Sequence, residues 1–294
     1  MEYKGYKIIE EDNSVLIEGV KDFSPVHTFE CGQCFRWIRQ RDGSYTGVAK
    51  ERVINVSFSD GMLRLYNSSL EDFKNIWYDY FDLGTDYLAV KEKITDDEIM
   101  KSAVKFGWGI RILKQDLWET LISFIISANN RIPRIMKSVE KISQLYGKEI
   151  YMDQNKYYTF PGYKEILNST IENLNICRAG FRCKYIHSAS KIINDEIISL
   201  KDIKKMDTDD AKSYLMKLAG VGPKVADCVL LYSGTKQDVF PTDVWVKRVM
   251  EELYFKKKCS LKDIQKMAED KFGNFSGFAQ QYLFYYAREN KIGR

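Results

Sequence analysis

The chain has 294 residues, of which 45% are hydrophobic and 14% aromatic, a composition typical of folded globular proteins and not of disordered ones. Its 45 lysines and arginines exceed its 41 aspartates and glutamates by only four, so overall charge alone does not indicate nucleic-acid binding. The start lacks the apolar core of a signal peptide and no 18-residue apolar run occurs, which predicts no membrane partner and a cytoplasmic protein, or a nuclear one in a eukaryotic cell.

Residues 1–66 are predicted to form an antiparallel β-sheet. The expected strands are the runs "YKIIE", "SVLIEGV", "CFRWIRQ", "SYTGVAK", "RVINVSF" and "MLRLYN", and turn pairs such as Asp12-Asn13, Asp42-Gly43 and Asp60-Gly61 separate them. A helix is expected from Leu70 onward. Together these elements predict a small N-terminal β domain with a flanking helix over residues 1–97.

The cysteines offer alternative functions that the sequence does not favour. Cys31 and Cys34 have the spacing of a redox motif, but they lie in a strand-rich region without the βαβ context of a thioredoxin-like site. The chain has no second pair of this spacing and only two histidines, which does not support zinc binding. Cys259 is alone in the C-terminal region, so a four-cysteine iron–sulfur cluster is excluded there.

Residues 98–294 are predicted to form a helical domain. Asp116 precedes the apolar run "LWETLISFIISA", which indicates a buried central helix, and the next helix ends at Gly147. Further amphipathic helices are expected over 164–173, 184–196, 207–218, 223–232, 243–255, 260–272 and 277–288. The predicted fold class is therefore α+β, with the small antiparallel domain packed on a larger helical one.

The run "LAGVGPKVADC" (218–228) predicts two helices joined by a glycine-bounded turn. Gly220 and Gly222 permit positive φ angles, and Pro223 suits the first position of a helix. The free N–H groups of such a turn, with Val221 between the glycines, can bind a phosphate oxygen of a DNA backbone. An ordinary helical hairpin with a glycine cap fits the same spacing.

Lys224 and Asp243 are the candidate catalytic residues. Lys224 lies in the first turn of its helix, where the positive end of the helix dipole disfavours an ammonium ion and favours an amine able to attack carbon. Asp243 is expected to cap the helix that follows it, and a capping carboxylate can also stabilise positive charge on a sugar. A solvated lysine and a purely structural cap remain the alternatives.

Several motifs of the sequence together resemble those of a known family. "LAGVGPKVADC" followed by "FPTDV" (240–244) resembles the helix-hairpin-helix and Gly/Pro-rich loop with aspartate of base-excision DNA glycosylases. The stretches "GQCFRW" (32–37), "GIRILKQD" (109–116), "FIISANNRIPRI" (124–135), "GFRCKYI" (180–186) and "GFAQQYLF" (277–284) resemble the 8-oxoguanine DNA glycosylases. The resemblance covers about residues 25–288 and implies a bifunctional enzyme, a glycosylase with AP lyase activity, that acts on double-stranded DNA containing 8-oxoguanine.

The resemblance also implies a role for individual residues. Lys224 matches the nucleophile that attacks C1′ and forms a Schiff base before β-elimination, and Asp243 matches the carboxylate that aids departure of the base. Within the lesion pocket, Gly32 matches the residue whose carbonyl accepts from N7–H of the oxidised base, and Gln280 matches the reader of its Watson–Crick edge. The residues that would enclose the ring are Cys228 and Phe284.

A second group of matching residues would contact the rest of the duplex. Asn129, Arg134 and Arg182 match residues at the orphaned cytosine, and Phe181 stands where the animal enzymes usually have a tyrosine wedge. Trp245 replaces an expected histidine at the lesion's phosphates, so Lys247 or Arg248 is an alternative phosphate contact. Asn129 could instead cap the next helix, and the arginines could hold phosphates.

Two other functions remain as alternatives to this one. A water-using alkylpurine glycosylase of the same fold would not need Lys224, and a non-catalytic helix-hairpin-helix module would not need that lysine paired with Asp243. The prediction includes no cofactor and no catalytic metal, although carbonyl groups of the hairpin could hold a structural cation. The enzyme is expected to act as a monomer.

Overall fold

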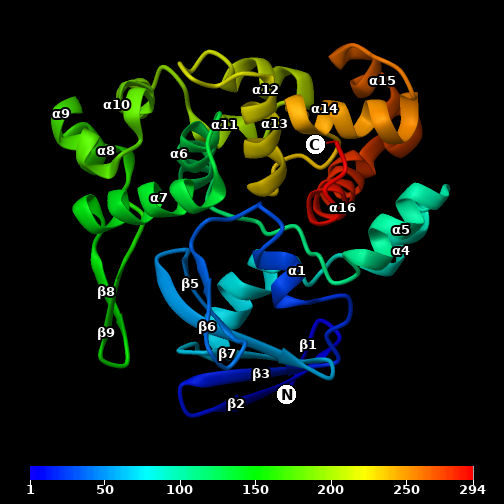
Figure 1. Ribbon diagram of the computed structural model, residues 1–294. Coiled ribbons are helices and arrows are strands. Elements are labelled where there is room, and N and C mark those ends of the chain that lie inside the picture. Colours follow the sequence, from blue (N-terminus) through cyan, green and yellow to red (C-terminus); the bar gives the residue numbers. More distant parts are fainter. Residues whose placement is uncertain (294) are drawn as a thin grey trace.

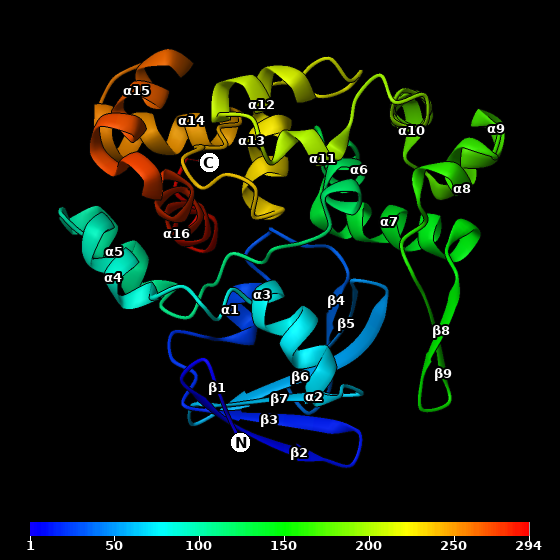
Figure 2. The ribbon, with the colours of Figure 1, turned by 180° about the vertical axis from the view of Figure 1, so that it is seen from behind.

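A computed structural model describes residues 1–293 and places an N-terminal sheet beside a larger helical domain. Figure 1 shows the sheet at the bottom and the helices above it, and Figure 2 shows the same division from behind. The buried apolar side chains form two clusters, one mostly in each domain; Cys31 and Phe35 belong to the cluster of the helical domain, and Leu113 belongs to that of the sheet. The α+β fold class expected from the sequence is confirmed.

The sheet has seven antiparallel strands in the order β1-β2-β3-β7-β6-β5-β4. Their bounds are β1 Glu2–Tyr3, β2 Tyr6–Glu11, β3 Ser14–Glu18, β4 Trp37–Arg39, β5 Tyr45–Ala49, β6 Arg52–Ser59 and β7 Met62–Tyr66. Asp60 and Gly61 both have positive φ angles (53° and 76°), as a two-residue hairpin requires, and they join β6 to β7. All strands expected from the sequence are present in this sheet, and among its seven strands only the short β1 was not expected.

The helix expected from Leu70 is made of three consecutive pieces, α2 Leu70–Asp72, the π-helical η1 Phe73–Trp77 and α3 Tyr78–Tyr80. The side chains of Phe73 and Trp77, and of Phe81 just after α3, are fully buried in the core of the sheet. A short helix, α1 Pro25–Phe29, precedes β4 and was not expected from the sequence. It begins with a proline after Ser24, whose hydroxyl accepts from the amide of His27.

The helical domain is built around α6, whose side chains are buried along most of its length. Its helices are α4 Tyr87–Ile94, α5 Glu98–Phe106, α6 Leu117–Ser127, α7 Ile132–Tyr146, α8 Tyr163–Leu167, α9 Ile171–Leu174, α10 Cys183–Asn194, α11 Leu200–Ile203, α12 Thr208–Leu215, α13 Pro223–Tyr232, α14 Val244–Met250, α15 Leu261–Phe272 and α16 Ser276–Glu289. Short 3-10 or π segments adjoin them: η2 Asn175–Cys177, η3 Gly180–Arg182, η4 Glu251–Phe255 and η5 Gly273–Phe275. Asp116 accepts from the amide of Glu119 and caps α6, as the sequence predicts.

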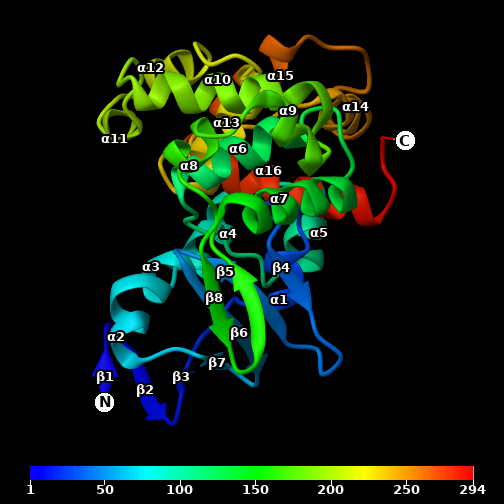
Figure 3. The same cartoon turned by 90° about the vertical axis from the view of Figure 1, so that its left-hand side faces the viewer.

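Two details of this domain differ from the sequence prediction. A hairpin of β8 (Glu149–Met152) and β9 (Asn155–Tyr158) extends from α7 alongside the sheet domain (Figures 1 and 3). The helix expected over 164–173 is instead two short helices, because the hydroxyl of Thr170 accepts from the amide of Asn173 and starts α9 anew. Both features depend on short polar segments that carry little periodic signal.

The boundary between the domains was predicted after residue 97, and it stays a prediction. Tyr87, Val90 and Ile94 of α4 belong to the hydrophobic cluster of the helical domain. Leu83, just before α4, belongs to the cluster of the sheet. The division of the two cores therefore lies close to the start of α4.

Within residues 1–293 there is no helix of the length and apolarity needed to cross a membrane.

Candidate active site

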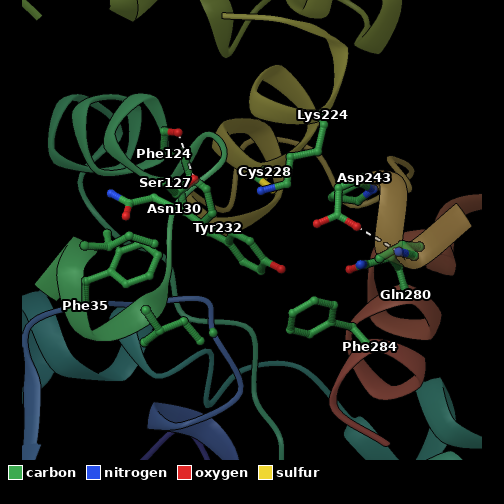
Figure 4. A pocket seen from close by; sticks show the side chains of 15 residues that line it. Phe35, Phe124, Ser127, Asn130, Lys224, Cys228, Tyr232, Asp243, Gln280 and Phe284 are labelled. Carbon is green, nitrogen blue, oxygen red and sulfur yellow. Dashed lines mark hydrogen bonds between the residues drawn. The ribbon is translucent and has the colours of Figure 1, made fainter. Parts of the chain in front are cut away.

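A cavity of about 130 Å³ lies where the two domains meet, and both domains line it (Figure 4). Gly32 and Phe35 come from the N-terminal domain, whereas Lys224 and Asp243 come from the starts of α13 and α14. The full lining is Gly32, Phe35, Phe124, Ser127, Asn130, Ile132, Ile135, Lys224, Cys228, Tyr232, Pro241, Asp243, Val246, Gln280 and Phe284. The two domains therefore form a shared cleft, in which Gly32 and Lys224 line the same cavity.

Lys224 is directed into this cavity by the hairpin that precedes it. Gly222 is the N-cap of α13 and Pro223 its first residue, so Lys224 lies in the first helical turn, as expected. Its Nζ lies 5.2 Å from the centre of the Phe124 ring, a cation–π distance. Figure 4 shows the amine reaching toward the space between Cys228 and Asp243.

Asp243 caps α14, as the sequence predicts. Its Oδ1 accepts from the amide of Val246 at 2.7 Å, which fixes the carboxylate at the helix N-terminus. The same carboxylate lines the cavity beside Lys224. An amine and a fixed carboxylate in one cavity can perform nucleophilic attack and charge stabilisation.

Gly32 adopts a backbone conformation that other residues rarely take. Its φ is +91°, and a Cβ atom built there would lie 3.2 Å from Cε1 of Phe284. A side chain at this position would therefore strain the loop and press on a wall of the cavity. Glycine allows the backbone itself to line the site.

Two buried glutamines hold the loop that carries Gly32. Gln33 donates to the carbonyls of Thr28 (2.8 Å) and Arg111 (2.7 Å) and accepts from the amide of Leu113 (2.9 Å). Gln281 donates to the carbonyl of Cys31 at 3.1 Å and accepts from the hydroxyl of Tyr232 at 2.6 Å. Since Tyr232 belongs to the helix of Lys224, Gln281 links the Gly32 loop to that helix.

The cavity contains a buried acceptor without a partner. Gln280 is 3% exposed, and its Oε1 accepts no hydrogen bond among the described residues. Cys228 and Phe284 line the same cavity, and burial raises the pKa of the Cys228 thiol to about 11 against the opposing charge of Lys224. A planar ligand with donor groups would fit this combination of amide, neutral thiol and aromatic ring.

The hairpin lines a second, more open groove that shares Lys224 and Asp243 with the cavity. Gly220 (φ +85°) and Gly222 line this groove, and their amides have no hydrogen-bond partner among residues 1–293. Val221 differs, because its side chain is buried and its amide donates to the carbonyl of Leu218. Two glycine amides are thus available for an anion.

Asn129 and Lys247 line the same groove, but the remaining DNA-contact candidates lie outside it. Arg182 is buried, and its guanidinium donates to the carbonyls of Ala128 (3.0 Å), Asn129 (3.1 Å) and Ala179 (3.2 Å). Asn129 has a φ of +50° and does not cap α7, whose N-cap is Arg131. Arg182 therefore holds the loop before α7 in the free protein.

Phe181 and Arg134 are free to contact a partner molecule. Phe181 is 58% exposed and lies against the guanidinium of Arg182, whose Cζ is 4.4 Å from the ring centre. Arg134 is exposed on the first turns of α7. An exposed aromatic ring supported by a cation is suited to stacking on a base.

Trp245 has a different environment from a phosphate-binding side chain. Its indole N–H donates to the carbonyl of Ile292 at 3.0 Å, and its ring packs edge-on against Phe284 with the centres 5.2 Å apart. Lys247, in contrast, lies in the groove, although it also pairs with Glu251 at 2.9 Å. A phosphate contact at this end of α14 stays a prediction, and its geometry favours Lys247.

Several lining residues were missed by the sequence analysis: Phe35, Phe124, Ser127, Asn130 and Tyr232. Phe35 lies inside the motif "GQCFRW", and Tyr232 is the last residue of the helix that carries Lys224, which were the available signals. Figure 4 labels all five at the cavity that Lys224 enters.

Cys31 and Cys34 are both free, buried thiols. Burial raises the pKa of Cys31 to about 11 and that of Cys34 well above its usual range. Each thiol donates to a carbonyl, at 3.3 Å from Thr28 and 3.5 Å from Phe29 respectively. Neutral buried thiols lack the reactivity of a redox pair.

Glu119 makes the stability of the domain junction dependent on pH. Its carboxyl lies 3.9 Å from Nη1 of the buried Arg36, yet burial outweighs this charge and raises the pKa of Glu119 from 4.5 to about 7. Between these values the unfolded chain ionises while the folded protein keeps the proton, so the free energy of unfolding falls as pH rises, by up to about 3 kcal/mol. Glu119→Gln removes this dependence, and denaturation at pH 4.5, 6 and 7.5 measures it.

The matched control is Glu140→Gln, whose side chain is 46% exposed and lies 4.0 Å from Arg36. The stability difference between Glu119→Gln and the parent protein should move in favour of the variant from pH 4.5 to 7 and then level off. A difference that stays constant over this range would show that Glu119 ionises normally.

Two family models together match most of the chain. Residues 15–121 match the N-terminal domain of 8-oxoguanine DNA glycosylase, and residues 122–273 match the HhH-GPD superfamily base excision DNA repair protein. A probable N-glycosylase/DNA lyase of Methanothermobacter thermautotrophicus is 33% identical over 217 residues, which are 67% of this chain and 69% of that protein.

Solved structures agree with these matches over nearly the whole chain. An 8-oxoguanine glycosylase/lyase of Clostridium acetobutylicum, in complex with double-stranded DNA containing cytosine opposite 8-oxoguanine, is 45% identical with a TM-score of 0.95 over 97% of this chain and 99% of that one. The MBOgg1 protein in complex with a low-affinity DNA ligand is 49% identical, with the same TM-score and the same coverage. The chain therefore belongs to the 8-oxoguanine DNA glycosylase family of the HhH-GPD superfamily.

Proposed function

We propose that this protein is a bifunctional DNA glycosylase that removes 8-oxoguanine from double-stranded DNA and then cuts the strand at the abasic site. The observation that supports this most directly is the convergence of Gly32, Gln280 and Lys224 on one cavity from two domains. A reader of the base and a nucleophile are then within reach of the same nucleotide. The relatives with this activity match nearly the whole chain.

The damaged nucleotide must leave the duplex to reach the cavity. The free amides of Gly220 and Gly222 bind a phosphate of the lesion strand, while Phe181 fills the stack that the nucleotide vacates. Arg134, and Arg182 once its guanidinium leaves the loop carbonyls, bond to the orphaned cytosine.

Lys224 and Asp243, at the starts of α13 and α14, carry out the excision. The Nζ of Lys224 forms a bond to C1′ as the bond from C1′ to the base breaks, and the base leaves with that electron pair. The carboxylate of Asp243 stabilises the positive charge that develops on the sugar. In the adduct, the nitrogen loses a proton and the bond from C1′ to O4′ breaks, so that O4′ takes up a proton, the sugar ring opens and a Schiff base forms. The Schiff base then loses a proton from C2′, and β-elimination breaks the bond from C3′ to oxygen, with the 3′ phosphate as the leaving group.

Discrimination against guanine rests on a single hydrogen. 8-Oxoguanine carries a hydrogen on N7, and the carbonyl of Gly32 accepts a hydrogen bond from this N7–H. Guanine has only a lone pair at N7 and cannot donate this bond. Leaving that buried acceptor unpaired costs roughly 1–3 kcal/mol. The unpartnered Oε1 of Gln280 accepts from the donors on the Watson–Crick edge of the base.

Borohydride trapping tests the proposal. The protein is incubated with duplexes containing 8-oxoguanine opposite cytosine, an abasic site, an alkylated purine or no damage, and the Schiff base is reduced to a stable adduct. We expect adducts with the first two duplexes only. Release of the alkylated purine without any adduct would support a water-using glycosylase, and binding without chemistry would support a non-catalytic module.

Gly32→Ala separates base recognition from strand cleavage. The added Cβ meets Phe284 at 3.2 Å in a backbone conformation that alanine avoids, so 8-oxoguanine release should fall on the order of 10²-fold. Cleavage at a preformed abasic site needs no base recognition and should stay within about threefold of the parent rate. Single-turnover assays on the two duplexes measure both.

The control for this variant is Gly5→Ala. Gly5 lies in the turn between β1 and β2 with a similar φ of +87°, but nothing lies within 4 Å of the added atom. This variant should leave both reactions unchanged. Equal losses in both reactions of Gly32→Ala would mean that the loop supports the whole site and not the reading of the base.

An enzyme with this substrate works where the chromosome is. We therefore place it in the cytoplasm with the nucleoid if the cell is bacterial, and in the nucleus if it is eukaryotic.

A further inference from the structure

A basic pocket of about 790 Å³ lies on the face of α7 opposite to the catalytic cavity. Five of its lining side chains are cationic, and none is acidic: Arg131, Arg134, Lys137, Lys141 and Arg178. None of these five forms an ion pair with the residues described, 1–293. In a chain whose net charge is only +4, this uncompensated cluster indicates an anionic partner.

The cations follow the helix axis in a row. Arg134, Lys137 and Lys141 recur at helical spacing along α7 and span roughly 10 Å. Successive phosphates of one DNA strand advance by about 3.4 Å along the duplex axis. The row is therefore long enough to follow several phosphates of a single strand.

A buried hydroxyl faces the same pocket. Ser138 is 1% exposed and lines the pocket, and its Oγ has no hydrogen-bond partner among the described residues. Serines inside helices usually bond back to the carbonyl one turn earlier, which this one does not do. Its hydroxyl is therefore available to donate to a ligand oxygen.

Arg178 closes the pocket from a strained position. It has a φ of +59° at the end of η2, a conformation that costs non-glycine residues of order 1 kcal/mol. The neighbouring Cys177 is buried, so the turn presents Arg178 to solvent beside α7.

The position of the pocket identifies the strand that would reach it. Ile132 and Ile135 of α7 line the catalytic cavity, while Arg131 and Arg134 line the basic pocket on the other face. Under the proposed function, Arg134 contacts the orphaned cytosine. The strand that carries this cytosine must then continue past Arg134, along the remaining cations.

We propose that Lys137, Lys141 and Arg178, together with Ser138, bind backbone phosphates of the undamaged strand next to the orphaned cytosine. This inference rests on the proposed function and adds a second backbone site to the one at the hairpin. It holds both strands of the duplex while the lesion is out of the stack.

Salt-dependent binding tests the site. Fluorescence anisotropy measures the affinity of the Lys224→Gln protein, which does not cut, for a duplex with 8-oxoguanine opposite cytosine. Adding Lys137→Ala, Lys141→Ala and Arg178→Ala should reduce the slope of log affinity against log salt by about 2–3, because each lost phosphate contact accounts for roughly 0.9. Each single variant should reduce it by about 1.

The matched control removes three charges at a distance. Lys4 lies in the turn between β1 and β2, Lys7 lies on β2, and Lys74 of η1 lies near Tyr3 of β1. In Figure 1, β1 and β2 are at the opposite end of the molecule from α13. The triple alanine variant of these lysines should keep the slope of the parent protein. If the slope falls equally in this control, the effect comes from net charge alone, and the proposal is overturned.

A neutral backbone identifies the strand. Methylphosphonates replace the phosphates flanking the orphaned cytosine in the undamaged strand, or the corresponding phosphates in the lesion strand. The parent protein should lose at least about tenfold in affinity on the first duplex, and the triple variant should lose no more than about twofold. Equal losses in both proteins would show that the cations contact something else and would overturn the proposal.

Ser138→Ala leaves the charge unchanged and tests the pocket itself. It should weaken binding by about fivefold to the lesion duplex with natural phosphates, and by less than twofold to the duplex with methylphosphonates in the undamaged strand. Borohydride trapping by the protein with native Lys224 separates this proposal from the proposed function. If no adduct forms, the proposed function fails. If an adduct forms but the slope of log affinity against log salt is unchanged in all variants, only the phosphate site is rejected.

Discussion

Replacement of Lys224 by glutamine is expected to abolish the borohydride adduct and to slow release of 8-oxoguanine by at least about 10³-fold. The amide of glutamine has no lone pair able to attack C1′, and in this cavity Lys224 is the lysine that lines the wall. Binding to the lesion duplex should stay within about tenfold, because the hairpin amides remain. Single-turnover excision and anisotropy on the same duplex measure both effects.

Lys217→Gln provides the matched control. Lys217 is an exposed lysine just before the hairpin, with its Nζ 4.9 Å from the centre of the Tyr214 ring and outside the cavity. It should form the adduct at the parent rate. If the Lys224 variant still traps the lesion, another amine is the nucleophile and the assignment is wrong.

Asp243→Asn is expected to slow excision on the order of 10²–10³-fold without loss of stability. Asparagine caps helices about as well as aspartate, so the bond from the amide of Val246 survives while the negative charge disappears. Asp243→Ala removes the cap as well and should lower the free energy of unfolding by about 1 kcal/mol in addition. Urea denaturation and single-turnover excision separate the two roles.

Asp116→Asn is the control for this pair. Asp116 caps α6 with a bond of 2.9 Å from the amide of Glu119, and it does not line the cavity. This variant should excise 8-oxoguanine like the parent protein. Full activity in Asp243→Asn as well would leave Asp243 with only its structural role.

The sequence predicts those parts of the structure that depend on neighbouring residues. Turn pairs such as Asp60-Gly61 and caps such as Asp116 and Asp243 mark where strands and helices begin and end, and the structure confirms them. The placement of Lys224 follows in the same way, because Gly222 and Pro223 define the start of its helix. Spacing alone still could not separate a catalytic pair from a capped hairpin, and the motif resemblance made that distinction.

The parts that the sequence could not predict depend on contacts between distant residues. Gln281 meets the carbonyl of Cys31 across 250 positions, and Gln33 meets that of Arg111 across 78. No local pattern separates such glutamines from solvated ones. Arg182 is a similar case, since its sequence does not reveal that its guanidinium is bonded to loop carbonyls in the free protein.

The origin of the two halves of the cavity has a consequence for damage to the enzyme itself. The amine of Lys224 and its partner Asp243 lie entirely on the helical domain, whereas Gly32 lies in a loop of the N-terminal domain. Gln33 donates to the carbonyl of Arg111 and Gln281 donates to the carbonyl of Cys31, and these two bonds hold that loop against the helical domain. Separation of the N-terminal domain from the helical domain would break these two bonds and would therefore remove selectivity before it removes reactivity. A partly unfolded molecule would be a nicking agent at abasic sites that has lost its ability to find oxidised guanine.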